Sequence, residues 1–227
     1  MLDQLAANLA AIRERIAAAT AAAGREPGSV TLVAVTKYAD DAWVGGLHEL
    51  GVRDFGEARS NQLAQRVALL PADVRWHFIG TLQRRQVAAV LDAFGGQGLI
   101  HSVDSLRLAT RIATLAAERG CVARALVQVN ITGEASKHGF SPDQLRADWS
   151  RLNADPGLQV DGLMAMAAAR SGPDDTAPRQ AFDTVARLRE ELAAGPLLSI
   201  GMSGDFEDAI AAGATHVRVG SALFEGL

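Results

Sequence analysis

One lysine of this 227-residue chain stands where a buried strand is expected to end. Lys37 follows the run Val30–Val35, which is short, rich in β-branched residues and unalternated, as is typical of a strand buried on both faces. Taken alone, a lysine at a strand end is most often a solvated charge. A lysine held partly out of water loses its proton readily, however, and can form a Schiff base with an aldehyde. Lys37 is therefore the first candidate for covalent chemistry.

Two loops of small residues toward the carboxyl terminus have the composition of a phosphate site. Ser203 and Gly204 precede an expected helix, and Gly220 and Ser221 follow the last expected strand. Each loop offers small residues, backbone N–H groups and a hydroxyl, which are the groups that bind phosphate. The simpler alternative makes Ser203 an N-cap and Gly220 a turn residue. A phosphate would also compete for the positive end of the helix with three acidic residues, unless these point outward: Asp205, Glu207 and Asp208.

An arginine and a histidine lie inside expected strands. Arg218 requires a partner, because an unpaired buried charge is costly. It either pairs with an inward carboxylate such as Glu57 or contacts a bound anion or ring nitrogen, and the residues leave both open. Alternation along the strand puts Arg218 and Gly220 on one face. His77, taken alone, is more typical of a satisfied core group than of a ligand.

The alternation of strands and helices predicts how these residues meet. Eight strands are expected to begin near positions 30, 52, 75, 99, 123, 160, 197 and 215. Helices are expected between them at 40–50, 59–70, 83–93, 104–119, 141 onward, 179–193 and 205–212. Alternating strands and helices form a parallel sheet, and eight such units in about 200 residues favour a closed (β/α)8 TIM-type barrel. The active face of such a barrel lies where the strands end, and phosphate commonly binds the loops after strands 7 and 8.

The alternative architecture is an open, doubly wound sheet. A nucleotide-binding sheet of that kind would have G-x-G-x-x-G after its first strand, where this chain has Thr36-Lys37-Tyr38. Residues 3–23 place apolar side chains on one helical face. We therefore expect a single domain over residues 1–227, with residues 1–24 as an extra amino-terminal helix packed on the barrel.

Composition excludes several classes of function. The net charge of −4 and the lack of a basic run argue against nucleic acid as a partner. Cys121 is the only cysteine, so sites built on several thiolates and internal disulfides are excluded. Charges at Arg13–Arg15 interrupt the amino-terminal stretch, and no long apolar run suits a membrane span. The sequence predicts a soluble, cytoplasmic protein without a metal site.

Short motifs run in order along nearly the whole chain. They are Ala34–Lys37, Phe55–Glu57, Trp76–Gly80 with Leu82 and Gln83, His101–Asp104, Gln128–Asn130, Ser136–Gly139, Gly162–Met164, Gly201–Ser203 and Val217–Ser221. In this combination the chain resembles the YggS/PROSC family of pyridoxal 5′-phosphate (PLP) homeostasis proteins. It departs from the family at Ala58, where asparagine is usual, and at Arg85-Gln86, which replaces an Asn-Lys pair. Taken alone, Lys137 in the polar loop Ser136–Gly139 is interpreted as solvated.

The resemblance implies the barrel of the alanine racemase amino-terminal domain, with PLP bound as a Schiff base on Lys37. It places the phosphate on the two small-residue loops and Arg218 close to the cofactor. The cofactor-binding residues that it implies are Lys37, His77, Ser203, Gly204, Arg218, Gly220 and Ser221. The implied partners are PLP and apo forms of PLP-dependent enzymes, and the protein is expected to be a monomer or weak dimer.

Three functions fit a lysine beside a phosphate site. They are a PLP carrier without its own reaction, a PLP-dependent enzyme such as an amino-acid racemase, and a sugar-phosphate barrel enzyme that uses Lys37 as base or Schiff-base former. Racemases of this barrel type carry a second, mostly β domain that supplies a tyrosine on the other face of the cofactor. Here the only tyrosine is Tyr38, beside Lys37. An arginine at the pyridine nitrogen would also weaken the ring as an electron sink. We favour the carrier.

Overall fold

Eight parallel strands in sequence order form a closed barrel, with β8 beside β1. The computed structural model describes residues 2–133, 138–168, 171–172 and 175–227. The strands are β1 Thr31–Val35, β2 Asp54–Glu57, β3 Arg75–Phe78, β4 Gly98–Val103, β5 Ala123–Val129, β6 Leu158–Ala165, β7 Leu197–Ser199 and β8 His216–Val219. The predicted (β/α)8 barrel is confirmed.

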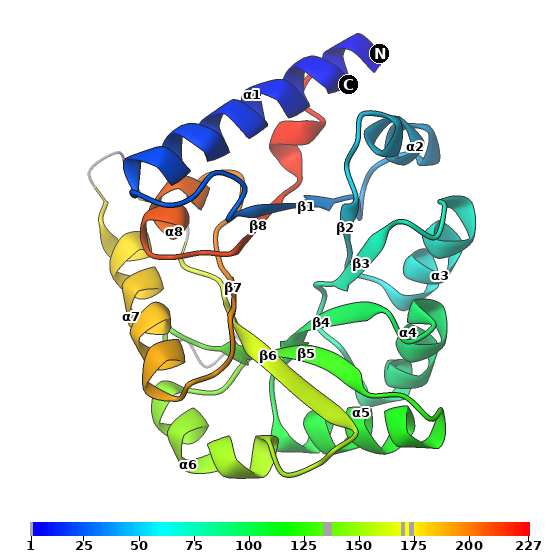
Figure 1. Cartoon of the computed structure of the whole chain (residues 1–227), viewed down its shortest axis with the longest axis vertical. Coiled ribbons are helices and arrows are strands. Elements are labelled where there is room, and N and C mark those ends of the chain that lie inside the picture. The colour runs from blue at the N-terminus through cyan, green and yellow to red at the C-terminus, as the bar shows by residue number, and fades with distance from the viewer. Residues whose placement is uncertain (1, 134–137, 169–170, 173–174) are drawn as a thin grey trace.

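Helices surround the strands as an outer ring (Figure 1). They are α1 Leu2–Ala22, α2 Asp41–Glu49, α3 Ser60–Leu69, α4 Val87–Phe94, α5 Leu106–Glu118, α6 Pro142–Leu152, α7 Ala177–Glu191 and α8 Phe206–Ala211, with short 3₁₀ helices η1 Arg84–Gln86 and η2 Ser221–Leu223. Within the described residues, no helix combines the length and apolar character that a membrane span requires.

The extra amino-terminal helix is present and joins the main hydrophobic core. Four α1 side chains at the predicted helical spacing are buried there: Leu5, Leu9, Ile12 and Ile16. Burial of such a stripe, at about 25 cal/mol per Å² of apolar surface, supplies much of the stability of a surface helix. The helix lies at the outer edge of the helical ring, next to α8 (Figure 1), and also contacts α2.

The predicted position of the second strand is wrong by about two residues. The strand expected at Val52–Phe55 is observed at Asp54–Glu57. Gly51 adopts φ +82°, and the N–H of Val52 donates to the carbonyl of Leu47. Residues 51 and 52 therefore end the preceding helix, because a left-handed glycine satisfies the last carbonyls of a helix.

The barrel interior is partly polar. Branched apolar side chains usually fill a barrel of this type. Here Leu99, Leu126 and Met164 form only a small apolar cluster inside it. Other interior-facing positions carry hydrogen-bonding side chains: His77, His101, Ser199, His216 and Arg218. These groups need partners, and those partners define the site.

Candidate functional site

Three neighbouring strands bring the predicted site residues to one end of the barrel. Lys37 follows β1, Gly220 and Ser221 follow β8, and Ser203 and Gly204 follow β7. Strand β8 lies between β1 and β7. A Cβ on Gly220 would lie 3.2 Å from Cβ of Val35, so the loop after β8 approaches the end of β1 closely.

A buried hydrogen bond fixes the backbone next to Lys37. Thr36 Oγ1 donates to Oε1 of Glu57 at 2.5 Å, and both residues are fully buried. Burial raises the pKa of Glu57, although the Thr36 hydrogen bond and the charge of Arg66 oppose the rise. Lys37 itself is half-buried, and its Nζ lies 5.0 Å from the ring centre of the exposed Tyr38.

The loops after β7 and β8 touch each other. The backbone N–H of Gly220 donates to Ser203 Oγ at 3.4 Å. Within the described part of the chain, the backbone N–H groups of Ser203 and Gly204 donate to no other group. Gly201 permits the turn before them, because its φ is +88° and a Cβ would lie 2.5 Å from Cβ of Ala209. The loop therefore presents two backbone donors that are free among the described residues, and a Cβ on Gly204 would meet no atom within 4 Å.

Ser203 is not the N-cap of α8, since Asp205 occupies that position. Two of the three acidic residues, Asp205 and Glu207, contact protein groups. Asp205 Oδ1 accepts the N–H of Met202 at 2.6 Å, and Glu207 forms an ion pair with Arg15 of α1 at 2.6 Å. Glu207 therefore does not compete for an anion at the loop.

Arg218 is buried but does not pair with Glu57, so the ion pair considered from the sequence is wrong. Glu57 faces away from the interior, toward Thr36 and α3, because of strand alternation. Arg218 Nη1 donates to the carbonyl of Ser199 at 2.8 Å and to its Oγ at 2.6 Å, and Nη2 donates to Ala165 O at 3.2 Å. Burial lowers the pKa of Arg218 to about 10, although the charge of Asp205 opposes the fall, and Arg218 stays charged at neutral pH.

The contacts of Arg218 leave part of its hydrogen-bonding capacity unused. A guanidinium has five N–H donors. Within the described residues, three hydrogen bonds are made to protein oxygens, none of them to a carboxylate. Two donors on a buried cation therefore remain for a ligand acceptor.

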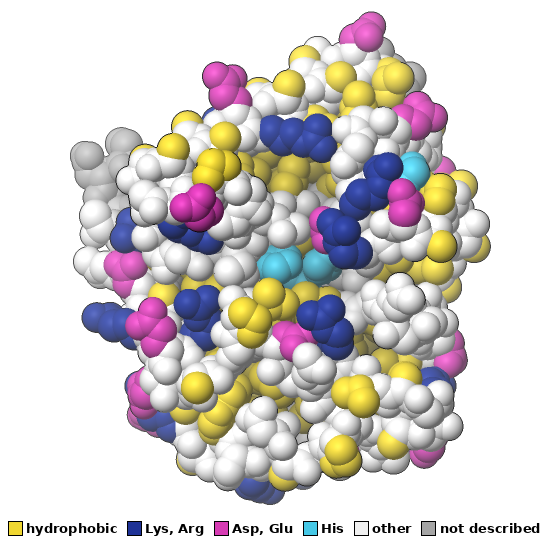
Figure 2. Space-filling model, viewed as in Figure 1, with side chains coloured by type: hydrophobic (Ala, Val, Ile, Leu, Met, Phe, Trp, Pro, Cys, Tyr) yellow, Lys and Arg dark blue, Asp and Glu magenta, His cyan; other side chains and the backbone are white. Residues whose placement is uncertain are grey.

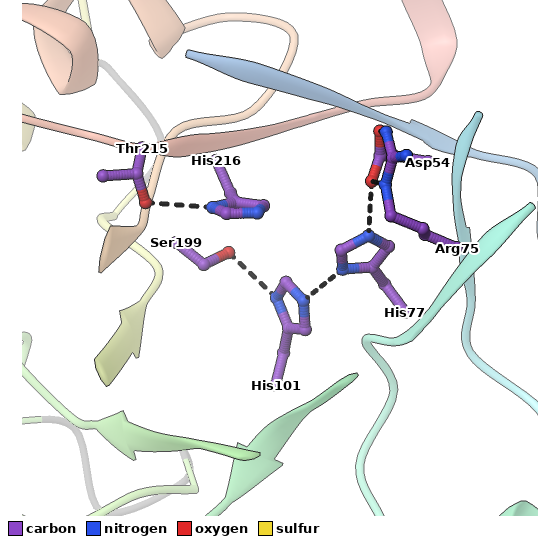
Figure 3. A network of polar contacts seen from close by, with 7 residues as sticks. All are labelled: Asp54, Arg75, His77, His101, Ser199, Thr215 and His216. Atoms are coloured by element: carbon purple, nitrogen blue, oxygen red, sulfur yellow. Dashed lines mark hydrogen bonds and ion pairs between the residues drawn. The ribbon is translucent and has the colours of Figure 1, made fainter. Parts of the chain in front are cut away.

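His77 lies in a chain of polar contacts deeper in the barrel (Figure 3). Its Nε2 is 3.2 Å from Oδ1 of Asp54, and its Nδ1 is 2.9 Å from Nε2 of His101. His101 in turn contacts Ser199 Oγ at 2.9 Å. His77 thus connects to Arg218 through His101 and Ser199.

A third histidine lies beside this chain. The ring of His216 is 5.8 Å from that of His77, and its Nδ1 is 2.9 Å from Thr215 Oγ1. Burial lowers its pKa to about 4, with the charge of His77 acting in the same direction and that of Asp54 opposing. Figure 2 shows histidine side chains at the centre of the visible face, with basic and acidic side chains around them. No described group of three or more His, Cys, Asp or Glu residues could hold a metal ion.

The sequence reasoning did not assign roles to Asp54, His101, Ser199 and His216. The available signal was the alternation of side chains along a strand. Each of these residues lies an even number of positions from a neighbour that faces the barrel interior. His101 lies two residues beyond Leu99, the partner of His77 across β3 and β4. Of the polar loop after β5, Ser136 and Lys137 lie outside the described residues.

A family model and two relatives with the same name match nearly the whole chain. Residues 1–227 match the family model described as alanine racemase, N-terminal domain. A protein of Deinococcus radiodurans is 43% identical over 95% of this chain and 97% of its own length. A protein of Pseudomonas aeruginosa is 39% identical over 98% of this chain and 96% of its own. Both are named pyridoxal phosphate homeostasis protein.

A solved structure supports the same relationship. PipY of Synechococcus elongatus, solved with PLP bound, is 32% identical to this chain and superposes with a TM-score of 0.80. The match covers 97% of this chain and 99% of that one.

Proposed function

The chain belongs to the family of pyridoxal phosphate homeostasis proteins, and from this premise we propose that it carries PLP as a Schiff base on Lys37. The observation that carries the proposal is the convergence of Lys37 and two small-residue loops at the ends of β1, β7 and β8. PLP supplies an aldehyde, a phosphate and a pyridine nitrogen, and each has a suitable group here.

The residues present fit these three groups. Lys37 would hold the aldehyde carbon. Ser203, Gly204, Gly220 and Ser221 would hold the phosphate, since Ser203 and Gly204 have free backbone donors. Arg218 would donate to the pyridine nitrogen through its unused N–H groups. His77 would contribute through His101 and Ser199, which lie between it and Arg218.

We further propose that the bound cofactor is stored and delivered without a dedicated reaction. Arg218, charged at neutral pH, would leave the pyridine nitrogen unprotonated and so weaken the ring as an electron sink. Racemisation needs a base on each face of the cofactor. The single tyrosine, Tyr38, is 76% exposed and lies on the Lys37 side. An amino-acid racemase is the alternative that activity assays would detect.

The proposal extends to partners and location. Apo forms of PLP-dependent enzymes are the expected recipients, and the protein would act in the cytoplasm as a monomer or weak dimer. A single, unpaired cysteine, Cys121, fits a reducing compartment.

Reduction with borohydride tests the assignment directly. The protein incubated with PLP should turn yellow, and reduction should add one phosphopyridoxyl mass to the peptide that contains Lys37. Lys37→Ala should remove both the colour and the adduct, while Lys137→Ala serves as the matched lysine control. An adduct on another peptide, or no adduct after incubation, would refute the assignment to Lys37.

A further inference from the structure

A continuous line of side chains crosses the barrel from Arg218 to a carboxylate near the strand starts. We call it the central chain, and its members are Arg218, Ser199, His101, His77 and Asp54. Successive polar atoms are 2.6, 2.9, 2.9 and 3.2 Å apart. All five residues are buried, and Figure 3 shows four of them pointing toward one another.

The chemistry of its two ends fixes which groups donate and which accept the hydrogen bonds of the central chain. An arginine only donates, so Ser199 Oγ accepts from Arg218, and an ionised carboxylate only accepts, so His77 Nε2 donates to Asp54. Burial alone would raise the pKa of Asp54, but hydrogen bonds from His77 and Arg75 and their charges outweigh it and lower the pKa to about 2. Asp54 is therefore ionised at neutral pH.

The two middle members then have one consistent arrangement. When His77 is neutral, its Nδ1 must accept, so His101 Nε2 donates. Burial is the main cause that holds the pKa of His101 well below its usual range, so His101 is neutral as well. His101 Nδ1 accordingly accepts the hydroxyl hydrogen of Ser199. With both histidines neutral, the donor of every hydrogen bond lies on the Arg218 side and its acceptor on the Asp54 side. Hydrogen bonds aligned in this way polarise and strengthen one another.

Arg218 has no hydrogen bond to a carboxylate among the described residues; the charge of Asp205 favours its charged form, and the central chain links it to a second carboxylate. Asp54 is reached through three intervening side chains, and Arg75 holds it from outside at 2.8 Å. Asp54 and Arg75 also line a groove of about 640 Å³ beneath α1. Lys37 does not line this groove, because it follows the opposite end of β1.

We propose that Asp54 is a positioning residue for the cofactor, the remote counter-ion that orients Arg218 through His77, His101 and Ser199. The inference rests on the proposed function, because it assumes that Arg218 faces bound PLP. Asp54→Asn keeps an acceptor oxygen for His77 but removes the charge. Since charge-assisted hydrogen bonds are about twice as strong as neutral ones, PLP affinity should fall about three- to tenfold, and the visible absorbance band should shift.

Asp161 provides a matched control. It is a buried carboxylate in the first half of β6 that pairs with the half-exposed Arg124 at 2.7 Å, as Asp54 pairs with Arg75. Its other hydrogen bond comes from Gln159 rather than a histidine. Asp161→Asn should therefore leave PLP affinity and the absorbance band unchanged. If Asp54→Asn lowers only the unfolding midpoint of the PLP-free protein, Asp54 has a structural role and the proposal is wrong.

A double-mutant cycle tests whether the effect travels along the chain. Ser199→Ala removes the link to Arg218, so adding Asp54→Asn to it should weaken PLP binding no further. Additive losses would overturn the proposal. Should Asp54→Asn not fold, His77→Gln with Ser199→Ala completes the same cycle.

A measurement without PLP separates this inference from the proposed function. ¹⁵N NMR of the PLP-free protein, recorded at a pH at which the spectra show both rings neutral, should show His77 and His101 as Nε2–H tautomers. A proton on His101 Nδ1 would reverse the chain and refute the inference, whatever the protein binds. Failure of the wild-type protein to bind PLP, with the expected tautomers, would refute the proposed function alone.

Discussion

Gly220 donates its backbone N–H to the side chain of Ser203 at 3.4 Å, which joins the loop after β8 to the loop after β7. The two loops are 17 residues apart in the chain, yet they form one surface beside the end of β1. The contact also turns the Ser203 hydroxyl into an acceptor, so its hydrogen is available to a ligand.

Pyridoxal, which lacks the phosphate, should bind far more weakly than PLP. Hydrogen bonds to a charged group contribute about 1.5–3 kcal/mol each, so losing several implies at least about a hundredfold loss of affinity. Titration of the wild-type protein with both compounds, followed by absorbance, measures the ratio. Equal affinities would show that Ser203, Gly204, Gly220 and Ser221 do not hold the phosphate.

Arg218→Gln should loosen PLP while leaving the fold largely intact. Within the described residues Arg218 makes no hydrogen bond to a carboxylate and interacts with Asp205 only through its charge, so the substitution breaks no direct ion pair. Losing its hydrogen bonds to the cofactor should weaken binding at least about tenfold. Arg25→Gln is the matched control, because Arg25 donates to the carbonyls of Ile210 and Ala214 and should affect stability alone. Unfolding of Arg218→Gln, with no stabilisation of the wild type by PLP, would identify Arg218 as structural.

Glu57→Gln should stabilise the protein increasingly as the pH rises. Burial raises the pKa of Glu57 in the folded state, and its Oε2 has no hydrogen-bond partner within the described residues. From about pH 4.5 upward, the unfolded carboxyl loses its proton while the folded one keeps it, so the wild type loses stability with rising pH up to the folded pKa. Glutamine does not titrate, so its advantage should be small at pH 4 and larger at pH 8.

Urea unfolding at several pH values measures this difference, and the exposed Glu49→Gln is the control. The advantage of Glu57→Gln should grow with pH, whereas Glu49→Gln should follow the wild type. A constant difference would mean that Glu57 titrates normally in the folded protein.

Much of the fold was predictable because the residues that end helices, and the periodicity of apolar side chains, are local features of the sequence. Leu5, Leu9, Ile12 and Ile16 predicted α1, and alternating short strands and helices predicted the barrel. The start of β2 was not predictable, because Val52 is β-branched but completes a helix terminus after Gly51. There, hydrogen bonding of the preceding helix overrode strand propensity.

The contacts of Arg218 could not be predicted from the sequence, for a different reason. From the sequence, the partner of Arg218 was either an inward carboxylate such as Glu57 or a bound anion or ring nitrogen, whereas the structure connects Arg218 to side chains from four other strands. Barrel closure sets those contacts, and no local pattern encodes them. The positions of Lys37, Gly220 and Ser203 followed from topology alone, since strand ends of a parallel barrel share one face.

The purified, PLP-loaded protein should show no meaningful racemase, transaminase or decarboxylase turnover. Proximity and exclusion of water supply much of an enzyme's rate. Lys37 is only half-buried at the barrel mouth, and the only tyrosine, Tyr38, is exposed beside it rather than opposite it. The loaded protein should nevertheless transfer PLP to an apo-enzyme, because release needs only reversible bonding at Lys37 and the phosphate loops. Chiral chromatography after incubation with the common L- and D-amino acids tests the first point, and recovery of apo-enzyme activity tests the second. Turnover of one substrate at about 1 per second, the low end for ordinary enzymes, that Lys37→Ala abolishes would establish an enzyme instead of a carrier.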